Sequence, residues 1–378
     1  MKVANIVFNP FINDSRVLKE ALSLQKEGYT IEVVAHGDID LPKTQTINRI
    51  RVKRFQYLNR KSLNSKFKKL KIYLAWIKDV SLYIKDFNIL HCNDLNTLPV
   101  ALIVKKIYKR DIKVLYDAHE YETETIGLNR VTKPIAKLAE KILIGYVDKV
   151  ITVSDSIADE YKRLYPYMEK PSLVLNTPKY IDVKKQNIFR ERLNIDTEQT
   201  IFLYQGGLDY GRGVEILLKV FMELSDRDSL AVIVFMGYGE LEEKIKETSK
   251  KYRNIYFYKA VSPDNLLDYT SSADFGIATI EDSCLSYRYS LPNKLFEYLM
   301  AEIPVIVSNL YEMRRLVQRY RVGVVAKENT IRGLIEAIEE ALKLNRLDFK
   351  ENIKEVKSIY NWENQERILL NIYRGLKR

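Results

Sequence analysis

Short runs of β-branched and aliphatic residues alternate along this chain with longer segments in which apolar residues recur every three or four positions. That alternation is typical of parallel strands joined by helical crossovers. In the first half the predicted strands are Val3–Phe8, Thr30–Ala35, Ile89–Asn93, Lys113–Asp117, Lys149–Val153 and Ser172–Leu175, with a helix predicted over Ser15–Glu27. In the second half they are Thr200–Gln205, Ala231–Met236, Ile255–Tyr258, Phe275–Ala278, Pro304–Ser308 and Val322–Val325. We therefore expect an α/β protein with two doubly wound, Rossmann-like domains that face a central cleft.

A polar and basic segment from Asn176 to about Asp196 interrupts the pattern and is the best candidate for a linker. The predicted division is a first domain over residues 1–180, a second over 181–358, and a terminal helix over 359–378 that packs back on the first domain. Because such sheets bind ligands beyond the carboxyl ends of their strands, we expect a nucleotide-sized ligand between the two domains.

Composition narrows the class of protein. The chain has 378 residues, 46% of them hydrophobic and 29% charged, with only 14 Gly and 10 Pro, which excludes a disordered or fibrous protein. Its two cysteines, Cys92 and Cys284, lie far apart without a zinc-binding spacing around either, so neither a disulfide framework nor a structural metal is expected. The sequence shows no signal-peptide core and no apolar run of ~20 residues. We expect a cytoplasmic protein, soluble or attached peripherally to a membrane.

The net charge of +11 predicts an anionic partner. The excess of positive charge is concentrated in one stretch of the chain. From Arg49 to Lys78 there are eleven cations and no acidic residue. A helix over residues 66–77 would mix lysines with aromatic residues, which suits the anionic inner face of the plasma membrane. The residues expected to contact it are Lys66, Lys68, Lys69, Lys71 and Trp76. The alternative is a solvated helix whose Trp76 packs on the core; nucleic-acid binding is not expected, because no recognition module is present.

Two segments of the second half could bind phosphate. The predicted strand that ends at Gln205 runs into a glycine-rich loop, Gly206–Gly213, and then into a helical pattern, so backbone N–H groups could approach a diphosphate that Arg212 neutralises. A plain tight turn is the alternative. In the second segment, Lys294 stands in the first turn of a predicted helix, where a bound anion would explain a cation. Glu297 lies on the same face and could accept both hydroxyls of a ribose, or could simply pair with Lys294.

Several motifs in a fixed order resemble the GT-B glycosyltransferases of the retaining family 4, over nearly the whole chain. These motifs are Asp14–Glu20, His91–Leu95, Asp117–Glu120, Val153-Ser154, Gly206–Gly213, Gly237–Glu240 and Pro292–Glu297. The resemblance implies a donor site for a nucleoside-diphosphate sugar in the second domain. Its residues would be Gly206, Gly207, Arg212, Gly237, Asn293, Lys294, Leu295 and Glu297.

The resemblance also implies roles. Arg212 and Lys294 would contact the diphosphate, and Asn293 and Leu295 would offer backbone N–H groups. His119 would reach the transferred sugar or its acceptor, so the residues expected to act in catalysis are His119, Arg212 and Lys294. The acceptor side would include Arg16, Asp94 and Glu120. No cofactor and no metal are expected, because preplaced cations would stabilise the departing diphosphate.

This chain departs from the family pattern at two positions. Gly207 stands where an Arg is usual, and Tyr289 stands where the first of two glutamates is usual. The predicted function is a retaining glycosyltransferase that acts on a cell-surface glycan or a lipid-linked acceptor. A nucleotide-sugar epimerase of the same fold and a non-catalytic glycosyltransferase-like partner subunit are the alternatives.

Overall fold

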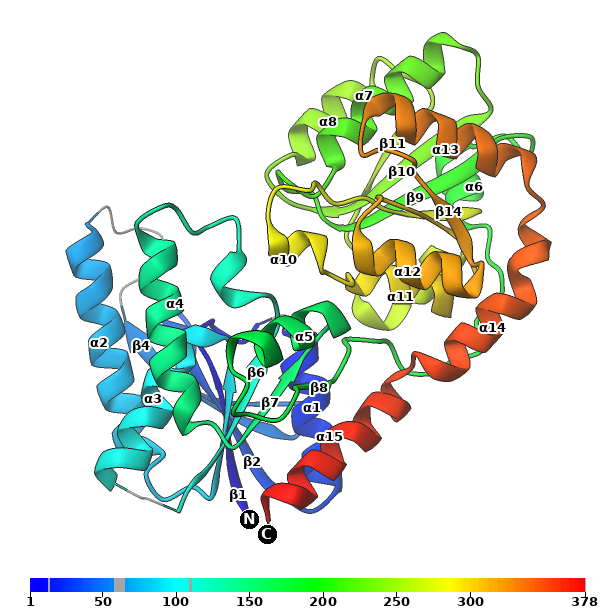
Figure 1. The fold of residues 1–378 in the computed structure, drawn as a ribbon. Coiled ribbons are helices and arrows are strands. Elements are labelled where there is room, and N and C mark those ends of the chain that lie inside the picture. Colours follow the sequence, from blue (N-terminus) through cyan, green and yellow to red (C-terminus); the bar gives the residue numbers. More distant parts are fainter. Residues whose placement is uncertain (13, 58–64, 109–110, 378) are drawn as a thin grey trace. The chain divides into compact units, whose positions relative to one another are not determined.

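The chain folds into two compact units (Figure 1). A computed structural model describes residues 1–12, 14–57, 65–108 and 111–377. Unit 1 consists of Met1–Leu175 together with Gln365–Arg378, and unit 2 of Asn176–Asn364. The division therefore falls just before residue 180, and most of the last helix, α15 (Trp362–Leu376), counts with unit 1. Arg60 and Lys61, two of the cations of the basic stretch, lie outside the described residues.

Unit 1 is built on an eight-stranded sheet with the order β3-β4-β2-β1-β5-β6-β7-β8. All neighbouring strands are parallel except the β3/β4 pair. The strands are β1 (Lys2–Val7), β2 (Thr30–Asp38), β3 (Thr44–Ile47), β4 (Ile50–Tyr57), β5 (Ile89–Asn93), β6 (Lys113–Ala118), β7 (Lys149–Thr152) and β8 (Ser172–Leu173).

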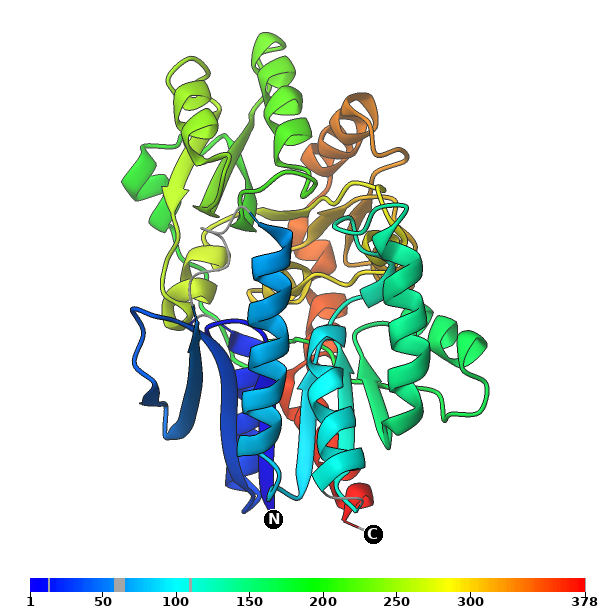
Figure 2. The ribbon, with the colours of Figure 1, turned by 90° about the vertical axis from the view of Figure 1, so that its left-hand side faces the viewer.

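Helices cover both faces of this sheet. Figure 2 shows α2, α3 and α4 side by side over one face, and α1 packs against the other. Asp14 begins α1, because its carboxylate accepts the backbone N–H of Val17 (3.2 Å). The helices are α1 (Ser15–Lys26), α2 (Lys66–Tyr83), α3 (Leu98–Ile103), α4 (Thr132–Leu143) and α5 (Asp155–Leu164).

The sequence pattern did not predict β3 and β4. In β4 the buried Ile50 and Val52 alternate with cations, so in the sequence the strand is indistinguishable from the rest of the basic stretch. Arg54 faces inward and is buried; its guanidinium donates to the carbonyl of Pro10 (2.8 Å) and to the side-chain oxygen of Gln45 (2.9 Å). This part of the basic stretch is therefore structural, and its Arg54 charge is not available to an anionic partner.

Unit 2 carries a six-stranded parallel sheet with the order β11-β10-β9-β12-β13-β14. In chain order this is 3-2-1-4-5-6, the order of dinucleotide-binding folds. The strands are β9 (Thr200–Gly207), β10 (Ala231–Tyr238), β11 (Ile255–Lys259), β12 (Phe275–Ala278), β13 (Val305–Val307) and β14 (Gly323–Val325). The order reverses between β9 and β12, so the ligand crevice of this unit is expected at their carboxyl ends.

The helices of unit 2 lie on both faces of its sheet (Figure 1). They are α6 (Ile188–Leu193), α7 (Val214–Asp226), α8 (Glu242–Ser249), α9 (Leu266–Ser271), α10 (Leu285–Arg288), α11 (Asn293–Met300), α12 (Tyr311–Tyr320), α13 (Ile331–Lys343) and α14 (Lys350–Ile359). The core between the sheet and α7 and α13 is aliphatic and aromatic, with Phe202, Phe221 and Phe235 fully buried. All the predicted strands occur in the two sheets. Across the described ranges, no helix combines the length and the apolar character that crossing a membrane requires.

Candidate functional site

The glycine loop of unit 2 follows β9, at the point where the strand order reverses. Gly206 and Gly213 have φ values of +108° and +80°, which L side chains rarely adopt. The hydroxyl of Tyr204 donates to the carbonyls of Gly207 and Arg212, at 3.1 Å each. The buried Tyr204 side chain thus holds both ends of the loop by hydrogen bonds.

Gly237 lies beside this loop, opposite Gly206 in the β9/β10 pairing. A Cβ atom at Gly237 would stand 1.9 Å from the carbonyl oxygen of Gly206. The residue therefore allows the two strands to approach. Gly237 was predicted to bind the donor; the role that the structure shows for it is to let β9 and β10 pack closely.

Lys294 and Arg212 flank the glycine pair at the end of β9. The side chain of Lys294 is 9% exposed, its Nζ lies 3.4 Å from the ring centroid of Tyr204, and its Cε lies 3.9 Å from the position of a Cβ on Gly206. The Cδ of Arg212 lies 3.7 Å from the position of a Cβ on Gly207. Burial and the nearby charge of Arg212 lower the pKa of Lys294 to about 7, against an opposing effect of Glu297.

Lys294 is buried close to a second cation. The charge of Glu297 favours the protonated form of Lys294, but burial and Arg212 outweigh it. A bound anion would stabilise the charged form of this lysine. Two cations beside glycine-rich backbone at a strand end have the chemistry to hold phosphate groups.

Glu297 is oriented by a residue that the sequence did not single out. The side-chain amide of Gln205 donates to Glu297 Oε2 (2.6 Å), and its oxygen accepts the hydroxyl of Thr270 (2.8 Å). The backbone N–H of Gln205 donates to the hydroxyl of Tyr298 (3.0 Å). A polar residue directly before the glycine pair, in a strand that is otherwise mostly apolar, is the one signal in the sequence that could have identified Gln205.

Two residues predicted to offer backbone N–H groups lie in the first turn of α11. Asn293, the first residue of the helix, is exposed. The N–H of Leu295 donates to the carbonyl of Pro292 (3.0 Å), and its side chain is fully buried. A contact between these N–H groups and a ligand stays a prediction.

The segment before α10 also reaches the glycine loop. The N–H of Glu281 donates to the carbonyl of Gly211 (3.3 Å), and Asp282 forms an ion pair with Arg288 (3.0 Å). Tyr289, which occupies the position of the missing first glutamate, follows α10 directly. The fold thus brings the backbone of Glu281 to the glycine loop.

In unit 1, His119 follows β6 and lies among three side chains from neighbouring strand ends. Its Nε2 lies 3.1 Å from both Asp117 Oδ2 and Asn93 Oδ1, and its Nδ1 lies 3.3 Å from Asp94 Oδ1. Burial acts to lower the pKa of His119, but the Asp117 and Asp94 carboxylates outweigh it and raise the pKa to about 10. The ring is thus an imidazolium at neutral pH, able to donate hydrogen bonds and unable to accept a proton.

The predicted acceptor-side residues divide into two groups. Asp94 contacts His119, and Glu120 is exposed beside it. Glu122, which the sequence did not single out, is half-buried; burial and the Asp94 charge raise the pKa of its carboxyl well above the usual range. The carboxyl group of Glu122, next to Asp94 and His119, is a further candidate for this site.

Arg16 does not belong to an acceptor surface. It is buried, and its guanidinium donates to both oxygens of Asp117 (2.8 Å each) and to the carbonyl of Val174 (2.7 Å). It also forms an ion pair with Glu20 (3.3 Å). The prediction that Arg16 contacts the acceptor is therefore wrong: the residue neutralises Asp117, which in turn holds His119.

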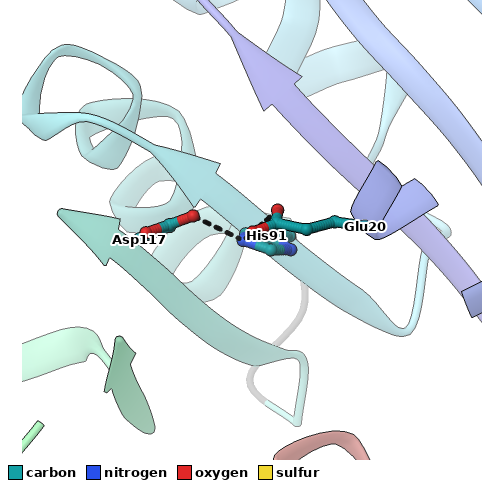
Figure 3. A group of neighbouring side chains, drawn as sticks. All are labelled: Glu20, His91 and Asp117. Atoms are coloured by element: carbon teal, nitrogen blue, oxygen red, sulfur yellow. Dashed lines mark ion pairs between the residues drawn. The ribbon is translucent and has the colours of Figure 1, made fainter. Parts of the chain in front are cut away.

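Glu20, His91 and Asp117 form the one group of three metal-ligating side chains within the described ranges (Figure 3). Nε2 of His91 lies 3.7 Å from Glu20 and 3.8 Å from Asp117. However, the Arg16 guanidinium already contacts both carboxylates, so a metal ion would face a fixed positive charge. The group fits a buried ion cluster and does not fit a metal centre.

The lysines predicted to contact a membrane lie on α2, as expected, but the aromatic residue does not. Lys66, Lys68 and Lys71 are exposed, and Lys69 is half-buried. Trp76 is fully buried against the sheet, with its ring 4.7 Å from that of Phe8. The prediction that Trp76 touches the membrane is wrong, because Trp76 faces the core.

Comparisons with known families match both units. The family Glycosyl transferases group 1 matches residues 185–356, and Glycosyltransferase Family 4 matches residues 15–177. An uncharacterized glycosyltransferase of Methanocaldococcus jannaschii is 22% identical over 373 residues, which covers 94% of this chain and 92% of that protein.

Solved structures share the fold over the whole chain. Sucrose-phosphate synthase from Thermosynechococcus elongatus is similar with a TM-score of 0.80 at 16% identity, over 100% of this chain and 99% of that one. HepE of Anabaena, in complex with UDP-glucose, is similar with a TM-score of 0.75 at 12% identity, over 99% of this chain and 100% of that one.

Proposed function

Because the chain belongs to the group 1, family 4 type of glycosyltransferases with the GT-B fold, we propose that it transfers a sugar from a nucleoside-diphosphate donor with retention of configuration. The proposed acceptor is a cell-surface glycan or a lipid-linked precursor. The observation that carries the donor assignment is the pair of cations, buried Lys294 and exposed Arg212, beside the glycine loop. It is supported by neighbours whose structures contain UDP or UDP-glucose, and by starch synthase IV of Arabidopsis thaliana bound to ADP and acarbose.

In the proposed reaction, the bond between the anomeric carbon and the distal phosphate oxygen breaks, and a bond to the acceptor oxygen forms on the same face of the sugar. Negative charge develops on the departing phosphate, where Arg212 and protonated Lys294 stabilise it. Glu297, held by Gln205, would accept the ribose hydroxyls. The acceptor proton goes to the departing phosphate.

His119 would act through its positive charge in this scheme, because both of its ring nitrogens already have partners within unit 1. Since its pKa is about 10, the imidazolium can stabilise negative charge, but it cannot serve as a general base at neutral pH. The proposed reaction needs no metal ion, because the fixed cations supply the charge that a divalent ion would otherwise provide.

We also propose that the protein binds peripherally to the cytoplasmic face of the plasma membrane. The exposed lysines of α2 support this, because each cation near an anionic surface contributes about 1 kcal/mol. Such binding would bring a lipid-linked acceptor to the site.

The donor assignment is tested by thermal unfolding with UDP, GDP, ADP, CMP and their sugar conjugates, in EDTA. Wild type is compared with Arg212→Ala and with Arg253→Ala, a control that removes an exposed arginine of the same unit. One nucleotide should raise the melting temperature of wild type and of the control, but not of Arg212→Ala. If no nucleotide stabilises wild type, the donor site is refuted and the partner-subunit alternative is favoured.

Retention is tested separately, once a donor is known. The anomeric configuration of the product, read by NMR with and without EDTA, should match that of the donor in both conditions. An inverted product would refute the proposed stereochemistry, and activity that EDTA abolishes would refute metal independence.

A further inference from the structure

Helix α4 exposes a stripe of large aliphatic side chains. Val131, Ile135, Leu138 and Ile142 are each between 55% and 71% exposed. Their spacing places them on one side of a helix, one turn above another. A contiguous apolar stripe on a surface helix marks a contact with another apolar phase or partner.

The opposite side of α4, which faces the protein, is polar at its centre. Glu140 is buried there and accepts the hydroxyls of Tyr161 (2.6 Å), Tyr165 (3.0 Å) and Tyr116 (3.2 Å). Surface helices usually turn their apolar side inward, and α4 does the reverse. Because three hydrogen bonds hold Glu140 inward, the rotation of the helix is fixed with the aliphatic stripe outward.

The exposed charges on and next to α4 are mostly positive. Lys141 and Arg130 are exposed beside the stripe, while Glu140, the one acidic residue of α4, is buried. Lys133 and Lys137 form ion pairs with Glu124, which is also buried. In the same layer of helices (Figure 2), α2 repeats the pattern: Phe67, Leu70 and Leu74 are at least half exposed between its lysines.

These charges decide what covers the stripe. A second copy of the chain, joined through a two-fold axis, would place one lysine-bearing patch against another of the same charge. An anionic bilayer instead offers phosphate groups to the cations and acyl chains to the aliphatic residues. The combination therefore favours a lipid surface.

We propose that α4 is the membrane-inserting element of this protein, with the stripe Val131–Ile142 entering the acyl region of an anionic bilayer while the lysines of α2 bind its headgroups. The inference rests on the membrane part of the proposed function and gives it a specific surface. It does not depend on the donor site.

The test is co-flotation with vesicles of phosphatidylglycerol and phosphatidylcholine, and of phosphatidylcholine alone. Wild type is compared with the stripe variant Ile135→Ser/Leu138→Ser. The matched control, Leu230→Ser/Leu347→Ser, removes two equally exposed leucines from unit 2. We expect the stripe variant to partition onto anionic vesicles at least tenfold more weakly than wild type, and the control to partition like wild type. Wild type should bind phosphatidylcholine vesicles much more weakly than anionic ones.

Three results would overturn the inference. If the stripe variant binds anionic vesicles as wild type does, α2 binds alone and α4 does not insert. If wild type binds neither kind of vesicle, the inference and the membrane part of the proposed function both fail, while the nucleotide-dependent melting shift still reports separately on the donor site. If sedimentation without lipid shows a wild-type dimer and a monomeric stripe variant, a second copy covers the stripe.

Discussion

Lys294 is the residue whose chemistry depends most on what binds. Burial and Arg212 keep the pKa of its ammonium at about 7 in the free protein, so near pH 8 it is mostly neutral. A diphosphate placed between the two cations would stabilise the charged form and raise that pKa. Donor binding above pH 7 should therefore take up a proton.

The first prediction follows from this coupling. Nucleotide affinity should fall as the pH rises above 7, by at most about tenfold for each pH unit, because one proton is taken up. Calorimetry at pH 8 in buffers of different ionisation enthalpy should detect that proton. Lys294→Met should bind more weakly and show no uptake, whereas equal proton uptake in this variant would assign the effect to another group.

His119 gives a second prediction, with the opposite direction of pKa shift. Its pKa is about 10 in the folded protein and about 6.5 in an unfolded chain, so the folded state holds the extra proton between these values. The stabilisation is complete below pH 6.5 and is lost as the pH rises towards 10. In urea unfolding from pH 6 to 10, the difference in stability between wild type and His119→Gln should shrink as the pH rises. A difference that stays constant over this range would contradict the raised pKa.

At the scale of the element, the conformation of the glycine loop after β9 depends on the close approach of the β10 backbone. Gly237→Ala would place a methyl group 1.9 Å from the carbonyl oxygen of Gly206, so the strand or the loop must move. We expect this variant to lose about 2 kcal/mol of stability, as overpacked sites do, and to lose the nucleotide-dependent melting shift. Gly145→Ala is the control, because a Cβ there has no atom within 4 Å. Normal nucleotide binding by Gly237→Ala would show that the loop does not need this close approach.

The elements also show what the sequence could predict. The central strands were predictable because helices cover both faces of each sheet and make the strands continuously apolar. β4 was not, because its inward residues alternate with cations. For α2 the helix was predicted correctly, but the sequence left two placements of Trp76 open, since lysines and aromatic residues mix around the helix. The structure has the alternative in which Trp76 packs on the core. The donor loop could be predicted because its glycines lie together in the sequence. The Arg16–Asp117 pair could not, because the two residues are far apart in the sequence.

At the scale of the whole molecule, the last helix ties the end of the chain to the ionic cluster of unit 1. The hydroxyl of Tyr373 on α15 lies 2.9 Å from Nδ1 of His91, and the ring of Tyr373 packs against Tyr29. Arg374 forms an ion pair with Glu27 at the end of α1 (2.6 Å). Unit 2 has a separate hydrophobic core, so the two units can differ in stability.

The last prediction tests this separation. Tyr373→Phe keeps the buried ring but leaves His91 without its hydrogen-bond partner, which should lower the stability of unit 1 by about 1–3 kcal/mol. Unit 2 should be unaffected, since Tyr373 is not part of the hydrophobic core of that unit. Calorimetry with a bound nucleotide should therefore show the transition of unit 1 at a lower temperature and that of unit 2 unchanged. Tyr180→Phe, which removes an exposed hydroxyl of unit 2, should leave both transitions in place. If Tyr373→Phe lowers both transitions equally, the two units unfold as one cooperative body, and the C-terminal helix stabilises the whole protein rather than unit 1.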